Sequence, residues 1–479
     1  MTAHLELIRA HFDKLLATGT ADFGPAPCPM WMASIDPRTG RYPDDDTRPP
    51  EIPRRHYRAI DAPRGCSLYW DQPAAVAAHA LSRITGDARY SDAVDRYVEA
   101  FLERCVARNG MLLWGNHYFW DAFQGRTLKF CGNETPFPVD FDAEEGDYHE
   151  ARPIPPAWEL FQRVSPDATR RAIEVFAARS LFDPATGGFN RHADQRRGCA
   201  FIESGGILVE SLAWLHARTG DGALLEQADR IADFSHRHRD PRTGLMENNP
   251  TVERWDKFAC TTEVGLWAGS LLRAAARCGG REAWIAKADQ AVSAYLAYGY
   301  DERAGRYYGR LRVADGAPVL GAGGTEQDVT QSLTHQPGDY ADVWRPLFPA
   351  HDYPMPMAEC CLRLHELTGA ERYRRACERW IEHIARSLPP REGRGAYAEH
   401  YGRCIHFLWR CEHALASRRA GELARTLAHE AVDALSDHGM FRSHPGEHRY
   451  DAVDGVGYLL LALIALATGE EPDMMGSGW

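Results

Sequence analysis

The sequence of 479 residues lacks several features that would place it in a simple class. No apolar run approaches the roughly 20 residues of a membrane-spanning helix, and the longest candidate is 456–466. The 12 cysteines contain no Cys-x-x-Cys pair and no His/Cys spacing typical of a zinc site. We therefore interpret them as buried free thiols. No Ser/Gly/Pro-rich linker interrupts the chain, which favours one catalytic domain over residues 1–479.

The chain also lacks an excess of positive charge, because its 55 Lys and Arg residues are outnumbered by 67 Asp and Glu residues, which gives a net charge of −12. Since no basic stripe is present, the composition argues against nucleic acid as a partner. The first 16 residues form an amphipathic helical pattern with Glu6 and Asp13 and no basic head, unlike a secretory signal. We expect a cytoplasmic protein that does not associate with a membrane.

Sequence motifs for cofactors and metals are missing as well. No dinucleotide fingerprint, Gly-x-Ser-x-Gly or His-Glu-x-x-His segment occurs, and the glycines at 321–324 follow no predicted strand. The acidic run 44–46 lies in a Pro-rich segment, where a solvated turn is the better interpretation. We therefore expect no cofactor and no metal ion.

The most informative feature present is a repeated helical hairpin. Apolar runs at helical spacing stop at tight turns such as 85–87, 219–221 and 368–369, and a second amphipathic run follows at once. The predicted hairpins are 73–85 with 88–105, 156–163 with 167–180, 203–219 with 221–238, 260–278 with 281–298, 353–368 with 371–387, and 402–417 with 420–436.

A last helix, 452–468, has no partner after it, so the N-terminal helix 1–16 is expected to supply one. The predicted fold is an all-α, six-hairpin (α/α)6 toroid, with room for an incomplete seventh pair. The irregular Pro-rich segment 18–70 is expected to cover one rim, and Pro73 suits the first turn of the next helix. An Asp-Pro-x-Thr-Gly sequence at 36–40, 183–187 and 240–244, with a degenerate copy at 301–305, predicts short β-turn loops.

The chemistry-bearing side chains fall in the long loops that precede the predicted helices, which concentrates function at one rim. The densest segment is 114–121, where aromatic rings adjoin carboxylates and a histidine, as sugar recognition requires. An alternative is that its aromatics only anchor a loop, and Glu203 is equally explained as a helix cap. The candidate catalytic residues are Asp121, Glu203, Glu263, Asp352, His117 and His192. The candidate substrate-binding residues are Asn116, Trp120, Tyr69, Arg191, Arg403, His400, Arg449 and Tyr450.

This pattern resembles the six-hairpin toroid superfamily of carbohydrate-active enzymes, which includes β-glucuronidases, unsaturated glucuronyl hydrolases, polysaccharide lyases and sugar epimerases. Locally, Asn116-His117-x-Phe119-Trp120 is similar to a segment of alginate-type toroid lyases, although Gly115 replaces a second Asn. That resemblance implies that Asn116 and His117 act at a uronate.

The resemblance implies an oligosaccharide substrate, and four hypotheses follow. The first is a glycoside hydrolase of the glucuronidase type, whose carboxylate pair comes from Asp121, Glu203, Glu263 and Asp352. His117 and His192 would assist, and Arg191 or Arg403 would bind the uronate carboxylate. The runner-up is a lyase that uses a His or Tyr base. A sugar epimerase and a non-catalytic glycan-binding toroid are the further alternatives.

Overall fold

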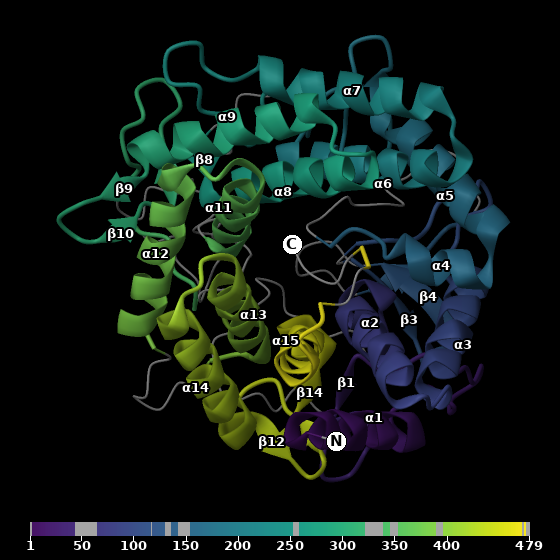
Figure 1. The fold of residues 1–479 in the computed structure, drawn as a ribbon. Helices are drawn as coiled ribbons and strands as arrows, with labels where there is room; N and C mark the ends of the chain where they lie inside the picture. The colour runs from purple at the N-terminus through teal and green to yellow at the C-terminus, as the bar shows by residue number, and fades with distance from the viewer. Residues whose placement is uncertain are drawn as a thin grey trace. The chain divides into compact units, whose positions relative to one another are not determined.

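The computed structural model describes residues 2–43, 65–115, 117–129, 136–141, 154–251, 258–320, 339–344, 353–388, 396–471 and 474–475. The fold is mostly helical, and its strands are short and belong to small sheets (Figure 1). The chain divides into two compact units. Unit 1 is Met1–Ala143, Pro156–Thr169 and Ser387–Gly478, and unit 2 is Glu144–Pro155, Arg170–Arg386 and Trp479.

Unit 1 contains three inner helices that lie side by side, α13, α15 and α2. Helices α14 and α3 complete hairpins with α13 and α2, and α1 packs against α15. The N-terminal helix therefore partners the last helix, as the sequence predicts. The α-helices that the structure describes in this unit are α1 (Ala3–Thr18), α2 (Leu68–Thr85), α3 (Arg89–Arg104), α4 (Trp158–Val164), α13 (Ala398–Ala414), α14 (Arg418–Leu435) and α15 (Val456–Thr468).

Unit 2 repeats the arrangement with inner helices α6, α8 and α11, whose hairpin partners are α7, α9 and α12. Helix α5 begins in unit 1 and continues into unit 2. The described helices of unit 2 are α5 (Pro166–Ser180), α6 (Ile202–Thr219), α7 (Gly222–Arg237), α8 (Thr261–Arg277), α9 (Glu282–Tyr298), α11 (Met355–Thr368) and α12 (Glu371–Arg386). The prediction of an all-α fold built from consecutive (α/α) hairpins is confirmed.

The hairpin turns are defined by glycine. Gly86, Gly220 and Gly369 follow α2, α6 and α11 with φ of 73°, 72° and 65°, a left-handed conformation that glycine adopts without steric cost. Each glycine N–H donates to the carbonyl of the residue four positions earlier, which satisfies one of the last free carbonyls of the helix. The second helix of each hairpin begins within a few residues.

Short antiparallel strands occupy the loops at the opposite ends of the inner helices. Two of the predicted β-turn loops are confirmed as hairpins, because β6 pairs with β7 around 183–187 and β9 with β10 around 301–305. The described strands are β1 (Ser34–Ile35), β2 (Gly65–Cys66), β3 (Tyr118–Asp121), β4 (Arg126–Lys129), β5 (Phe137–Pro138), β6 (Leu181–Asp183), β7 (Gly188–Phe189), β8 (Ala259–Cys260), β9 (Tyr300–Asp301), β10 (Arg306–Tyr307), β11 (Arg310–Leu311), β12 (Ser436–Asp437), β13 (Met440–Phe441) and β14 (Tyr450–Asp451).

Small residues bring neighbouring inner helices into backbone contact. A Cβ on Gly265 of α8 would lie 2.4 Å from the backbone nitrogen of Met357 of α11. In unit 1, a Cβ on Gly402 of α13 would lie 2.4 Å from the backbone of Tyr458, and one on Gly457 of α15 would lie 2.3 Å from that of Ala74. A larger side chain at these positions would push the helices apart.

The sequence predicts Pro73 in the first turn of its helix, and this prediction is wrong. Because α2 begins at Leu68, Pro73 lies beyond the first turn. Its carbonyl carbon would lie 2.6 Å from a Cβ on Gly457, so the residue belongs to a close helix contact. Within the part of the chain that the structure describes, no helix combines the length and apolar character needed to cross a bilayer.

Candidate active site

A buried carboxylate lies in the first turn of inner helices in both units. Glu203 in α6 and Glu263 in α8 are 3% and 1% exposed, and Glu399 in α13 is 4% exposed. Each carboxylate precedes a glycine by two or three residues, and Gly206, Gly265 and Gly402 approach the neighbouring inner helix. The local sequence thus fixes both the polar group and the helix packing beside it.

In unit 2, the loop that leads into α6 has an unusual backbone. Ala193, Gln195 and Cys199 have φ of 54°, 62° and 52°, three of the five left-handed non-glycine residues that the described part of the chain contains. Such conformations are costly for residues with a Cβ and concentrate at functional sites. The loop is held by Asn190, whose side chain donates to Asp194 Oδ1 and to the Arg196 carbonyl, both at 2.8 Å.

This loop presents Arg191 and His192 side by side. The Arg191 guanidinium packs 4.0 Å from the ring centre of Phe201, and its Nε donates to His192 Nε2 at 3.3 Å. The His192 backbone N–H donates to Asn190 Oδ1 at 2.7 Å, which fixes the backbone position from which the imidazole side chain extends. In this contact Nε2 is the acceptor, so its lone pair faces the Arg191 N–H.

The first turns of α6 and α8 are adjacent. The Ile202 N–H donates to the Asn248 carbonyl at 2.9 Å, and Asn248 Nδ2 donates to Cys260 Sγ at 3.1 Å. A Cβ on Gly206 would lie 3.2 Å from the Trp267 Cα, one turn further along both helices. The two helices therefore run in the same direction from a common end, where both begin with a glutamate.

Several buried polar groups surround that end. Asn248 and Asn249 are 1% and 0% exposed, and Asn248 Oδ1, Asn249 Nδ2 and Thr261 Oγ1 have no hydrogen-bond partner among the described residues. Arg310 is 2% exposed in β11, directly opposite Cys260 of β8. Buried polar groups are normally matched, so this concentration is typical of a site for a polar ligand.

The glycines and a threonine at this end contribute to packing. The glycines after Glu203 do not open space for a ligand, because a Cβ on Gly205 would lie 2.6 Å from the Phe189 ring. They serve packing instead. Thr262 does not cap its own helix, because its hydroxyl donates to the Tyr353 carbonyl at 2.9 Å and joins α8 to the residues before α11.

In unit 1, the corresponding residues form an ion pair. Arg403 Nε donates to Glu399 Oε1 at 2.8 Å, both side chains are about 5% exposed, and the guanidinium lies 3.7 Å from the Tyr458 ring centre. The Tyr397 ring lies 5.8 Å from that of His400 and 4.9 Å from that of His444. Arg403 is thus held by a carboxylate of its own helix.

Three of the proposed substrate-binding residues of unit 1 belong to its interior. The Tyr450 hydroxyl donates to Asp71 Oδ1 at 3.3 Å, and Tyr97 donates to Oδ2 at 2.6 Å. Burial raises the pKa of Asp71 to about 7 and raises the pKa of Tyr450 well above its usual range. Tyr69 is 2% exposed between Trp70 and Trp114. Tyr450 and Tyr69 therefore pack the core, and Arg449, next to Tyr450 in sequence, is 6% exposed.

The aromatic segment before β4 has a structural role at its acidic end. Asp121 Oδ1 accepts the backbone N–H groups of Phe123 and Gln124 at 2.9 Å, and Oδ2 accepts Gln124 Nε2 at 3.0 Å. Trp120 is 5% exposed under the Arg104 guanidinium at 4.7 Å, and His117 is buried directly before β3. Asp121 therefore holds the β3–β4 turn. Asn116 and Asp352 lie outside the described residues.

Sequence reasoning missed Asn248, Asn249 and Arg310 of unit 2. A usable signal exists for the asparagines, since they follow the β-turn loop 240–244 just as Asn190 follows the loop 183–187. Arg310 carries no such signal, because its position depends on the β8–β11 pairing between distant segments.

The described residues contain no group of three or more His, Cys, Asp or Glu side chains that could hold a metal ion. The described cysteines are free thiols and mostly buried, as predicted.

Comparisons with known proteins point to enzymes that act on carbohydrates. A family model described as periplasmic pectate lyase matches residues 76–202. This range contains His117, Arg191 and His192 and ends at Ile202, directly before Glu203. It covers about a quarter of the chain, so the match supports an enzyme class without establishing membership of the family.

Similar solved structures include a family 76 glycoside hydrolase from a bovine Bacteroides thetaiotaomicron strain (12% identity, TM-score 0.48, 97% of this chain and 77% of that chain). An inactive α-1,6-mannanase variant from Salegentibacter sp. HEL1_6 in complex with α-1,6-mannotetrose has 8% identity and a TM-score of 0.48, covering 97% and 99%. The unsaturated glucuronyl hydrolase from Bacillus sp. GL1 has 13% identity and a TM-score of 0.44, covering 67% and 85%. At these values the similarities assign no activity.

Proposed function

We propose that this chain is a carbohydrate-active enzyme that cleaves uronate-containing glycans by β-elimination at the Arg191–His192 loop of unit 2. The observation that carries the proposal is the contact between Arg191 Nε and His192 Nε2 in a strained loop, within the segment matched by a pectate lyase family model. This favours the lyase hypothesis over the hydrolase hypothesis that the sequence alone placed first.

The chemistry needs a base for the proton beside the uronate carboxyl and a cation that neutralises that carboxyl. The His192 imidazole suits the first task because its Nε2 acts as an acceptor, and the Arg191 guanidinium suits the second because a guanidinium binds carboxylates through two parallel hydrogen bonds. When Arg191 engages the substrate carboxylate, His192 Nε2 becomes available to take the proton. Electrons from the broken C–H bond form the new carbon–carbon double bond, the bond from the sugar carbon to the glycosidic oxygen breaks, and the leaving oxygen takes a proton from water.

The polar end of α6 and α8 supports binding of a hydroxyl-rich ligand. Asn248, Asn249 and Thr261 supply buried amide and hydroxyl groups, and Arg310 supplies a second buried cation. A site built to bond sugar hydroxyls discriminates strongly against ligands that lack them, because its buried groups would then stay unmatched.

Hydrolysis is the second candidate, and a different observation favours it. Glu203 and Glu263 lie in the first turns of adjacent helices that run in the same direction, which is a suitable origin for an acid/base carboxylate pair. In that mechanism both glutamates are essential and Arg191 has a binding role.

The test measures two products from polygalacturonate and other uronate polymers: ultraviolet absorbance of an unsaturated uronate, and new reducing ends. We expect both signals from the wild type, and a turnover loss of about 10²–10⁴-fold in His192→Ala. Arg191→Ala removes the cation proposed to bind the substrate carboxylate. Arg197→Ala removes an exposed arginine of the same loop and controls for the loss of charge alone. Reducing ends without absorbance, lost in Glu203→Gln and Glu263→Gln, would support hydrolysis instead. Neither product from any uronate polymer would refute both mechanisms.

A further inference from the structure

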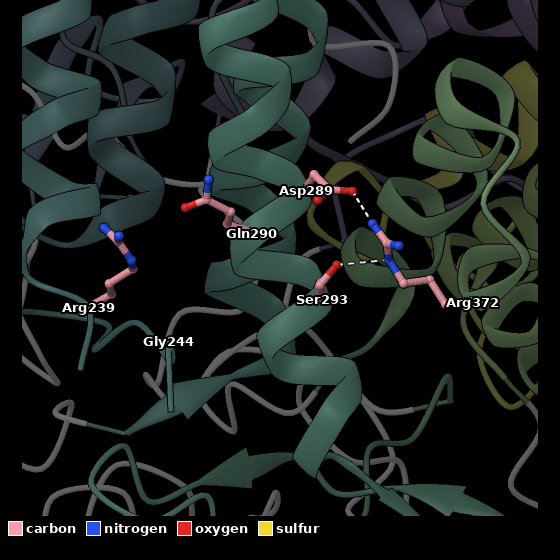
Figure 2. A pocket seen from close by; sticks show the side chains of 6 residues that line it. All are labelled: Arg239, Gly244, Asp289, Gln290, Ser293 and Arg372. Atoms are coloured by element: carbon pink, nitrogen blue, oxygen red, sulfur yellow. Dashed lines mark hydrogen bonds and ion pairs between the residues drawn. The ribbon is translucent and has the colours of Figure 1, made fainter. Parts of the chain in front are cut away.

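Unit 2 also contains a surface pocket that the proposed active site does not use. Its volume is about 500 Å³, and Figure 2 shows the residues that line it. None of them belongs to the Arg191–His192 loop or to the first turns of α6 and α8. The lining residues are Arg239 after α7, Gly244 of the following turn, Asp289, Gln290 and Ser293 of α9, and Arg372 of α12.

Arg239 supplies a cation without a carboxylate partner among the described residues. Its Nη1 donates to the His236 carbonyl at 2.9 Å and lies 3.1 Å from His236 Nδ1. Burial, with the charges of Arg239 and Lys287, lowers the pKa of His236 to about 4, so the imidazole is neutral near pH 7. The positive charge of Arg239 is thus available to a ligand.

Arg372 lies on the other side of Gln290 (Figure 2). Its Nη2 donates to Asp289 Oδ1 and its Nε donates to Ser293 Oγ at 3.0 Å, so α9 fixes its orientation. Its Nη1 has no partner among the residues that the structure describes. The pocket therefore offers two separate guanidinium groups with an exposed amide between them.

We propose that this pocket binds a segment of an acidic oligosaccharide, separately from the active site. The inference rests on the proposed function for the chemistry of the ligand. Arg239 and Arg372 would bind carboxylates of different uronate units, and Gln290 would bond the intervening hydroxyls. A chain with regularly spaced carboxylates fits two separated cations better than a single compact anion does. Asp289 neutralises part of the charge, so binding is weak and falls as salt rises.

The experiment is affinity electrophoresis in gels that contain polygalacturonate, with dextran gels as the neutral control. All proteins carry Arg191→Ala, so that retention does not depend on the active-site arginine. We expect Arg239→Ala to weaken retention about tenfold, the loss of one charge-assisted hydrogen-bonding group. Arg242→Ala removes an exposed arginine of the same turn that does not line the pocket, and it should leave retention unchanged. Arg239→Gln, which keeps a polar side chain at this position, and the unfolding midpoints of all the variants control for loss of folding.

Equal retention of Arg239→Ala and its parent, or absence of retention in the parent, would overturn the pocket proposal. Equal weakening by Arg239→Ala and Arg242→Ala would also overturn it, because only net charge would then matter. The proposed function is tested by a separate measurement, the turnover of short soluble uronate oligosaccharides by the wild type, which does not depend on this pocket. Retention without turnover would refute the function and leave the pocket supported.

Discussion

The two units build the same feature, a buried carboxylate in the first turn of an inner helix, but surround it differently. In unit 1, Glu399 pairs with Arg403 of its own helix, and Asp71 accepts two tyrosine hydroxyls. In unit 2, Glu203 and Glu263 begin two helices that meet beside Asn248. The comparison teaches that the helical repeat fixes the position of an acid, whereas the neighbouring segments decide whether it serves stability or chemistry.

The largest effect is expected at the ion pair of unit 1. Glu399→Gln removes the carboxylate charge that faces the buried Arg403 guanidinium and should lower the free energy of unfolding by about 3–5 kcal/mol. Urea denaturation measures this. The matched variant Glu263→Gln in unit 2 should change stability much less. Arg403→Met added to Glu399→Leu should restore most of the loss, and a double variant no better than the single one would contradict the pairing.

The second prediction concerns the dependence of stability on pH. Burial raises the pKa of Asp71 from 3.8 to about 7, so the folded state keeps a proton that the unfolded state releases. This stabilisation is fully present below pH 3.8 and is lost as pH rises to about 7. The loss is at most about 4 kcal/mol. Asp71→Asn should flatten the unfolding free energy between pH 4 and 7, and an unchanged slope would contradict the assignment.

A smaller effect is expected where inner helices touch. Gly265→Ala places a Cβ 2.4 Å from the Met357 backbone nitrogen and should cost about 1–3 kcal/mol. Because the shift occurs next to Glu263, turnover should fall as well. The control is Gly222→Ala at the start of α7, where a Cβ meets nothing within 4 Å. Equal thermal midpoints for the two variants would show that the helix contact is not tight.

The smallest predicted effect separates a structural acid from the proposed site. Asp121→Ala removes three hydrogen bonds from the β3–β4 turn and should lower stability by about 1–2 kcal/mol. Turnover per folded molecule should stay at the wild-type value, since Asp121 is engaged in the turn. A large loss of turnover at unchanged stability would return Asp121 to the catalytic residues.

Helical periodicity was sufficient to predict the hairpins, because turns such as Gly86 and Gly220 have one well-defined conformation. The pairing of α1 with α15 also followed from the pattern. Helix starts were less accurate. α2 begins at Leu68 and α13 at Ala398, in segments with weak local helical signals, and both helices make close backbone contacts there, at Gly457 and Gly402.

The site was harder to predict than the fold. Residue type suggested Glu203, Arg191 and His192, but it also suggested Tyr450 and Asp121, which pack or hold a turn. A buried tyrosine and an exposed one look alike in sequence, and only the partners distinguish them. Closure of the ring, the single domain and the cytoplasmic location stay predictions.

The interval between each acid and its glycine constrains how this protein can change. Successive residues of an α-helix are rotated by about 100°. One residue added between Glu399 and Gly402 would therefore turn either the carboxylate away from its surroundings or Gly402 away from the Tyr458 backbone. Substitutions at either position can be tolerated separately, but a change in length cannot satisfy both. Natural variation in these first turns should therefore replace residues and avoid insertions, which would accumulate in the loops before them.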